Sequence, residues 1–190
     1  LDEPRYVKMF LDEARLAASL HHHNIVQVND IGQEAGEYFF AMEYVHGETV
    51  RQLLDMTTGI QYSEDYADPK AEIWSHLRAG SVLPRPPGYD GPKSFYAFLQ
   101  TVKKEGEHGK GFAYKTVNTD ALGWVIARAT GKSVGENLQE LIWSKLGTEQ
   151  DAYFSIDTVG TEFAGGGLSM SLRDMARVGE MMRQGGKFNG

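Results

Sequence analysis

Apolar residues recur at helical spacing near the start of the chain and then at strand-like density. Residues 4–20 place five apolar side chains on one helical face: Val7, Phe10, Leu11, Ala14 and Ala18. This spacing predicts an amphipathic helix, and Pro4 suits its first turn. Residues 25–31 and 38–45 are rich in β-branched and aromatic side chains on either side of a glycine-containing turn. They predict a β-hairpin.

The following segment alternates between short helical patterns and irregular stretches. A short helix is predicted to begin at Thr49 and to end by Gly59, and a second covers residues 95–102. Residues 59–92 carry crowded proline and glycine toward their end and predict a mostly irregular stretch. Loops of this length usually carry function or are disordered.

The C-terminal third predicts further helices with recognisable ends. One face of a long helix carries four apolar residues: Leu122, Val125, Ile126 and Ala129. Gly131 suits a left-handed cap after this helix, and the pair Ser133 and Glu136 predicts a capping box that opens another. Residues 152–156 predict a strand. Ser171 caps a last helix that is predicted to turn three residues inward: Met175, Val178 and Met182. Residues 165–167, all glycine, predict a tight turn or close packing.

Composition and charge narrow the classes of function. The 190 residues are 41% hydrophobic and 24% charged, as in soluble globular proteins. The sequence has no cysteine, which excludes disulfides, thiolate metal sites and a cysteine nucleophile. A formal net charge of -7 argues against nucleic acid and anionic membranes as partners. Neither a signal peptide nor a membrane-length apolar run occurs, so a cytoplasmic location is the default expectation.

Two stretches near the N-terminus carry one family pattern: Phe10–Val26 and Tyr38–Glu48. They resemble the N-lobe of a bacterial serine/threonine protein kinase. The resemblance implies that Glu13 corresponds to the C-helix glutamate and Met42 to the residue guarding the ATP pocket. Phosphoryl transfer also needs a glycine-rich loop, a strand lysine, and H-R-D and D-F-G motifs, and none of these occurs in the sequence. We therefore interpret Glu13 as a solvated helix residue.

Three consecutive histidines, His21–His23, do not predict a metal site. Consecutive residues on a helix point in different directions, and these have no carboxylate or histidine partner at a fixed spacing. We predict neither a metal nor a cofactor.

Five separated segments in the rest of the chain carry a second family pattern: Val50–Ile60, Tyr66–Pro69, Phe112–Asp120, Ala164–Met170 and Arg173–Met182. They resemble the β-lactamase and penicillin-binding-protein superfamily of serine hydrolases, in particular its 6-aminohexanoate-dimer hydrolase (nylon-oligomer hydrolase) and esterase-like branch. The resemblance implies acyl transfer from a small amide, ester or β-lactam to water. In that family a serine in S-x-x-K is the nucleophile, a tyrosine moves protons, and a K-T-G strand shapes the oxyanion hole.

The resemblance also implies roles for particular residues. Tyr114 matches the proton-transferring tyrosine. A free phenol ionises only near pH ~10, so a tyrosine that acts as a base needs nearby cations. Asn118 would supply an orienting amide, and Thr116 is a competing match for that position. Four aromatic residues either line a substrate cleft or cover the core beneath the long loop, and both interpretations stay open: Tyr62, Tyr66, Trp74 and Tyr89.

The two patterns meet at Gly47–Leu54, a string that fits both families. We predict a kinase-like fragment at residues 1–48 and a hydrolase fragment at residues 49–190, with an α+β fold: a helix-rich hydrolase subdomain preceded by a helix and hairpin. No serine precedes lysine by three positions, and K-T-G is absent. We therefore predict a catalytically incomplete fragment or chimera that self-associates through exposed apolar surface. The alternatives are an ATP-binding kinase fragment or a non-catalytic recombination product.

Overall fold

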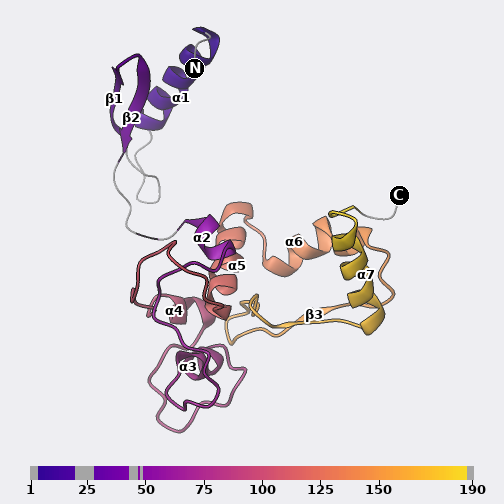
Figure 1. Ribbon diagram of the computed structural model, residues 1–190. Coiled ribbons are helices and arrows are strands. Elements are labelled where there is room, and N and C mark those ends of the chain that lie inside the picture. Colours follow the sequence, from indigo (N-terminus) through magenta and orange to yellow (C-terminus); the bar gives the residue numbers. More distant parts are fainter. Residues whose placement is uncertain (1–3, 20–27, 43–46, 48, 188–190) are drawn as a thin grey trace. The chain divides into compact units, whose positions relative to one another are not determined.

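The computed structural model describes residues 4–19, 28–42, 47 and 49–187 of an α+β chain (Figure 1). By compactness the chain divides into two units, Leu1–Gly47 and Glu48–Gly190. Compactness does not report ancestry, so the predicted family boundary at residue 48 stays a prediction. Within the described ranges, none of the helices combines the length and apolar character needed to cross a membrane.

The first unit is a helix followed by a hairpin. Helix α1 spans Pro4–Ser19, and strands β1, Val28–Glu34, and β2, Glu37–Met42, pair antiparallel. The connecting Ala35 and Gly36 both have positive φ angles, of 50° and 86°, which matches the twist of a tight hairpin turn. Ala14 and Val28 are buried. The predicted helix and hairpin are confirmed here, and predicted strand residues 25–27 and 43–45 lie outside the described residues.

The second unit contains most of the helices and a two-stranded sheet. Its elements in chain order are α2 (Val50–Leu54), α3 (Glu72–Ala79), α4 (Phe95–Leu99), α5 (Thr116–Thr130), α6 (Val134–Leu141), the 3-10 helix η1 (Trp143–Lys145), β3 (Tyr153–Phe154), β4 (Leu168–Ser169) and α7 (Leu172–Arg183). The predicted caps are confirmed: Ser133 forms a capping box, Ser171 accepts from the Asp174 N–H, and Gly131 adopts φ 69°. Thr49, where a helix was predicted to begin, also forms a capping box.

Residues 59–92 are mostly irregular, as predicted, but helix α3 interrupts them and was not predicted. The helix turns Ile73, His76 and Ala79 inward, and all three are buried. A buried histidine interrupts the apolar period in the sequence, so packing rather than local pattern determines this helix. Helix α2 is also shorter than predicted: it ends at Leu54, and Met56 takes φ 53°.

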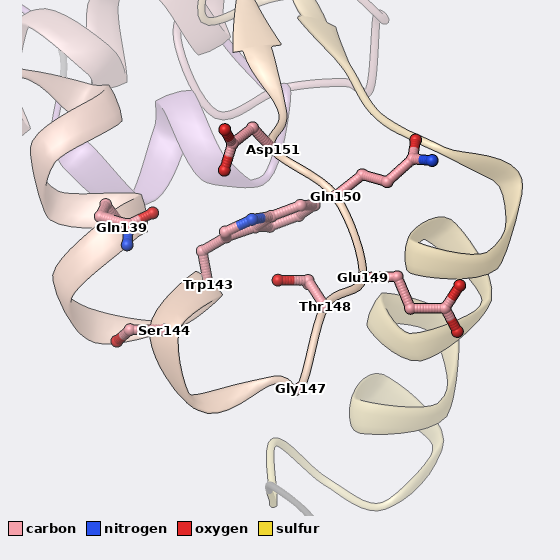
Figure 2. A pocket seen from close by; sticks show the side chains of 8 residues that line it. All are labelled: Gln139, Trp143, Ser144, Gly147, Thr148, Glu149, Gln150 and Asp151. Atoms are coloured by element: carbon pink, nitrogen blue, oxygen red, sulfur yellow. The ribbon is translucent and has the colours of Figure 1, made fainter.

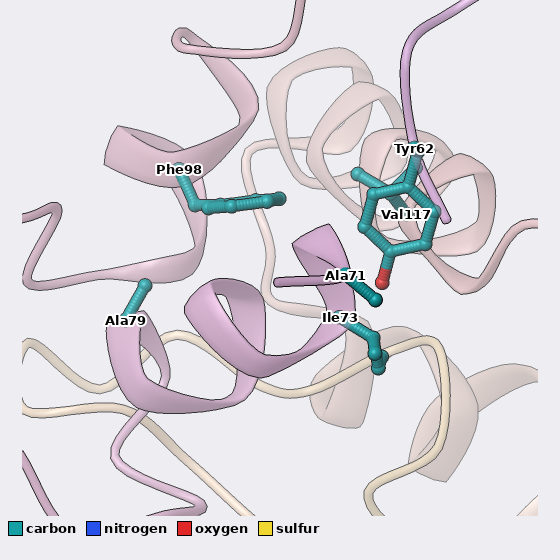
Figure 3. Close-up of a cluster of buried hydrophobic side chains, with 6 residues drawn as sticks. All are labelled: Tyr62, Ala71, Ile73, Ala79, Phe98 and Val117. Carbon is teal, nitrogen blue, oxygen red and sulfur yellow. The ribbon is translucent and has the colours of Figure 1, made fainter. Parts of the chain in front are cut away.

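The core of the second unit lies between α3, α4 and α5 (Figure 3). Six buried side chains form it: Tyr62, Ala71, Ile73, Ala79, Phe98 and Val117. Figure 3 shows Tyr62, from the segment before α3, pointing toward the helix with its hydroxyl at the inner end. This core fixes the start of α5 beside the segment that carries Tyr62.

Two apolar helix faces are exposed. In α5, Val125 and Ile126 are 41% and 42% exposed, whereas the residues it buries are mostly near its beginning. In α7, Met175 and Met182 are 55% and 70% exposed, so the prediction that they turn inward is wrong. The predicted helix α7 is present, but among the described residues only its Asp174 is buried.

Candidate functional site

Tyr114 presents an exposed ring from a tethered backbone. It lies two residues before α5 begins, and its side chain is 59% exposed. The preceding Ala113 N–H donates to the Met56 carbonyl at 2.8 Å. The following Lys115 donates from its ammonium to the Ile60 carbonyl. The ring is therefore accessible, while the chain on each side of it is held by the segment from Met56 to Ile60.

Thr116, the first residue of α5, is enclosed from two directions. Its backbone N–H donates to the Glu64 carboxylate, which places a negative group at the N-terminus of α5, where the helix dipole favours one. Gly165 packs on it so closely that an added Cβ would lie 2.4 Å from Thr116 Cγ2. The glycine run at residues 165–167 thus serves close packing, as the sequence predicted.

Asn118 is fully buried, with both ends of its amide engaged. Its Oδ1 accepts from the Thr58 hydroxyl at 2.9 Å, and its Nδ2 lies 3.3 Å from Met56 Sδ. These contacts hold the 56–58 segment against α5. The orienting role predicted for Asn118, and the competing match at Thr116, stay predictions.

A buried polar chain, Tyr62–His76–Asp120, runs behind this surface. The sequence indicated Tyr62 as a cleft or core aromatic residue but neither His76 nor Asp120 as its partners. The Tyr62 hydroxyl lies 2.8 Å from His76 Nδ1. His76 Nε2 lies 3.1 Å from Asp120 Oδ2, close but not aligned as a hydrogen bond. The other oxygen of Asp120 accepts the Gly165 N–H at 3.0 Å. The only signal in the sequence was the helical spacing of His76, three residues after Ile73 and three before Ala79.

Burial keeps the Tyr62 phenol protonated. Desolvation is the main reason that the pKa of Tyr62 is raised, and the charge of Glu64 adds to it. The neutral phenol shares a hydrogen bond with His76 Nδ1. The His76 ring stacks on Phe98, with centroids 4.6 Å apart, and meets Phe95 and Phe163 edge-on. This aromatic surround keeps water from the chain of polar groups.

Tyr66 and Trp74, which the sequence analysis assigned together to a cleft or to a cover of the core, are in contact. Their ring centroids are 5.7 Å apart at 85°, an edge-to-face contact. The Trp74 Nε1–H donates to the Asp68 carbonyl at 2.8 Å, and Tyr66 is 62% exposed. The pair forms an aromatic surface on the long loop, and its role in binding stays a prediction.

A polar pocket of about 520 Å³ lies elsewhere in the unit, between the α6–η1 turn and the segment before β3 (Figure 2). Figure 2 shows the Trp143 indole crossing toward that segment, while Glu149 turns away toward α7. Glu149 pairs there with Arg177 at 2.6 Å, and Ser144 donates to the Glu140 carbonyl. With its serine unaccompanied by a base, this pocket does not assemble a hydrolytic nucleophile.

A smaller cavity of about 230 Å³ adjoins Asn118. Its other walls are apolar side chains of α2, α4, α5 and their connections: Leu53, Ile60, Leu99, Val102, Val117, Ala121 and Trp124. It extends the core toward the surface near the start of α5.

The remaining predicted residues lie in the first unit. Glu13 is exposed on α1, as a solvated helix residue should be, and Met42 ends β2. Residues 21–23, the consecutive histidines, lie outside the described residues. In the part of the chain that the structure describes, no three histidine, aspartate or glutamate side chains gather to hold a metal ion.

Known proteins match both the kinase-like and the hydrolase-like segments of the chain, and the longer match defines the class of protein. The Beta-lactamase family matches residues 41–190, so the chain belongs to that family. The 6-aminohexanoate-dimer hydrolase of Paenarthrobacter ureafaciens is 40% identical over 159 residues, which cover 83% of this chain and 40% of that protein.

A solved structure agrees with that relationship. The putative 6-aminohexanoate-dimer hydrolase from Bacillus anthracis superposes with a TM-score of 0.69 at 38% identity, covering 75% of this chain and 37% of its own. The chain therefore spans about two fifths of the length of these hydrolases. The serine/threonine-protein kinase PrkC of Bacillus subtilis is 38% identical over 53 residues, which are 28% of this chain and 8% of that kinase. Both resemblances noted in the sequence are thus confirmed.

Proposed function

We propose that this chain is a catalytically incomplete portion of a serine hydrolase that cleaves a small amide or ester by acyl transfer to water. Membership of the Beta-lactamase family and the similarity to 6-aminohexanoate-dimer hydrolases support the class. The observation that carries the proposal is Tyr114, which matches the family tyrosine and stands exposed at the start of α5.

Tyr114 is the proton-transfer residue in this proposal. Its exposed ring is accessible to a nucleophile and a substrate, and the bonds of Ala113 and Lys115 to the 56–60 segment restrict how far the backbone can drift. General acid–base catalysis requires the proton donor or acceptor to lie within hydrogen-bond reach of the reacting group. A tethered backbone with a free side chain meets that requirement.

The missing part is the nucleophile. The sequence has no S-x-x-K and no K-T-G, and the chain spans 40% of its Paenarthrobacter relative. The lysine adjacent to Tyr114 is held at the Ile60 carbonyl, so its main visible role is to anchor the loop. Without its nucleophile, an enzyme of this kind retains only residual catalysis from binding and polarisation.

Substrate contacts are assigned to the aromatic surface beside the site. Tyr66 and Trp74 form an edge-to-face pair whose exposed tyrosine suits an uncharged aliphatic or amide-bearing ligand. Asn118 acts in this proposal through position, because both ends of its amide hold the 56–58 segment. Glu13 and Met42 belong to the kinase-like fragment and have no catalytic role in this proposal.

Hydrolysis of a p-nitrophenyl short-chain ester tests the proposal. The purified chain and its Tyr114→Phe variant are compared with a buffer blank after each is shown to unfold cooperatively. We expect no turnover above the blank from either. Turnover by the chain that disappears in Tyr114→Phe would show a complete site and would overturn the proposed incompleteness.

A further inference from the structure

Two segments far apart in the sequence clamp the residues that follow Tyr114. On one side, the Ile60 carbonyl and the Glu64 carboxylate bind the Lys115 ammonium and the Thr116 N–H. On the other side, Gly165 packs on Thr116: a Cβ added to Gly165 would lie 2.8 Å from the carbonyl oxygen of Thr116. Both sets of contacts therefore hold the backbone next to Tyr114, from which its exposed side chain projects.

The buried Tyr62–His76–Asp120 chain connects those two clamps. Tyr62 belongs to the same segment as Ile60 and Glu64, and its hydroxyl lies 2.8 Å from His76 Nδ1. Asp120 lies one helical turn after Thr116 on α5, 3.1 Å from His76 Nε2. Its second oxygen accepts the N–H of Gly165 at 3.0 Å. The path therefore leads from one clamp to the other through two side chains of α3 and α5.

Burial makes this path stiff. Tyr62, His76 and Asp120 are 6%, 0% and 2% exposed. Polar groups removed from water need partners within the protein, and losing one partner costs the full desolvation of the other. Displacement of either clamp would break a contact that water cannot replace, because Phe95, Phe98 and Phe163 surround the imidazole.

We propose that His76 and Asp120 are positioning residues for Tyr114, acting through the clamps on Lys115 and Thr116. The inference rests on the proposed role of Tyr114 in proton transfer. The buried chain keeps the loop that carries Ile60 and Glu64 and the turn that carries Gly165 at one fixed separation. The exposed side chain of Tyr114 projects from the backbone directly before the residues that these two segments hold.

Fluorine NMR of the full chain carrying 3-fluorotyrosine tests this role without requiring turnover. The Tyr114 signal is assigned by its loss in Tyr114→Phe. Asp120→Asn keeps the side-chain shape but replaces one acceptor with an amide donor, so the side chain can no longer present an oxygen to both His76 and Gly165. We expect the Tyr114 signal to shift or broaden in this variant.

Ile73→Ala is the matched control, because Ile73 is 2% exposed on the same helix as His76 and lies in the same core as Tyr62, but its apolar side chain forms none of the polar contacts of the chain. It should lower stability and leave the Tyr114 signal in place. An unchanged Tyr114 signal in Asp120→Asn, or an equal change in Ile73→Ala, would overturn the positioning role. If Asp120→Asn does not fold, Tyr62→Phe, which removes one hydroxyl, decides by the same spectrum. The ester assay tests the proposed function separately, so the two failures are distinguishable.

Discussion

Gly165 and Thr116 pack against each other with no room for a side chain on the glycine. A Cβ there would lie 2.4 Å from Thr116 Cγ2 and 3.0 Å from Asp120 Oδ2. Because the nearest atoms belong to a buried residue and its backbone, we expect Gly165→Ala to destabilise the chain by about 1–3 kcal/mol, the usual cost of overpacking. Urea unfolding measures it.

Gly179 provides the control for that substitution. It lies within α7, where an added Cβ meets nothing within 4 Å. Gly179→Ala should therefore stabilise the helix by roughly 0.5–1 kcal/mol, since alanine loses less backbone entropy. Equal effects of the two substitutions would contradict the close packing at Gly165.

Tyr62 makes stability depend on alkaline pH. Burial and the charge of Glu64 raise the pKa of the folded phenol above the value near ~10 of an unfolded tyrosine. Above that pH the unfolded chain has released a proton that the folded chain still holds, so the free energy of unfolding falls as pH rises. The contribution is complete below pH ~10 and declines by about 1.4 kcal/mol per pH unit above it.

Comparison with Tyr62→Phe isolates this effect from other alkaline titrations. The variant should be less stable at pH 7 by about 1–3 kcal/mol, because it leaves His76 Nδ1 buried without its partner. Its stability should also fall less steeply above pH ~10 than that of the parent chain. Parallel pH profiles would show that Tyr62 ionises equally well when folded.

Local sequence carries much of this fold, and distant packing decides the rest. The caps at Thr49, Ser133 and Gly131 were predictable because each depends on hydrogen bonds within one helical turn. Helix α3 was not predicted, because its buried His76 gains its environment from Tyr62 and Asp120, which come from other segments. A period of apolar residues shows which face they share but not whether anything covers that face.

The candidate site divides in the same way. Tyr114 was found because a motif around it matches a family. The polar chain behind it joins three segments of different sequence position, and no spacing rule brings them together. The same limit applies to Met175, whose helical face was read correctly and whose exposure was not.

Exposed apolar residues on α7 lead us to expect self-association. Met175 and Met182 lie two helical turns apart on one face of α7 and are 55% and 70% exposed. Sedimentation velocity should show association that rises with concentration and decreases in the double variant Met175→Lys, Met182→Lys.

A control with the same added charge is available on a polar surface. Gln139 and Gln150 are both exposed. The pair Gln139→Lys and Gln150→Lys should leave association closer to that of the parent chain. Equal reduction in both double variants would attribute association to net charge rather than to the apolar face.

The kinase-like segment should not bind ATP. The sequence lacks the glycine-rich loop, the strand lysine and the D-F-G metal ligand that hold nucleotide phosphates and Mg²⁺. Ligand that binds only the folded state raises the melting temperature. We expect no change in the melt with millimolar Mg-ATP, and a dose-dependent rise would favour the ATP-binding alternative.

Restoring the missing nucleophile in trans tests the central claim most directly. The chain is mixed with the part of the Paenarthrobacter 6-aminohexanoate-dimer hydrolase that lies outside its match to this chain, and ester hydrolysis is measured. The relative, divided at the ends of its 159-residue match to this chain and remixed, is the positive control. We predict turnover that appears only in the mixture and is lost with Tyr114→Phe. If the divided relative regains activity while this chain supports none, or supports it equally well with Tyr114→Phe, the assignment of Tyr114 to a serine hydrolase site is wrong.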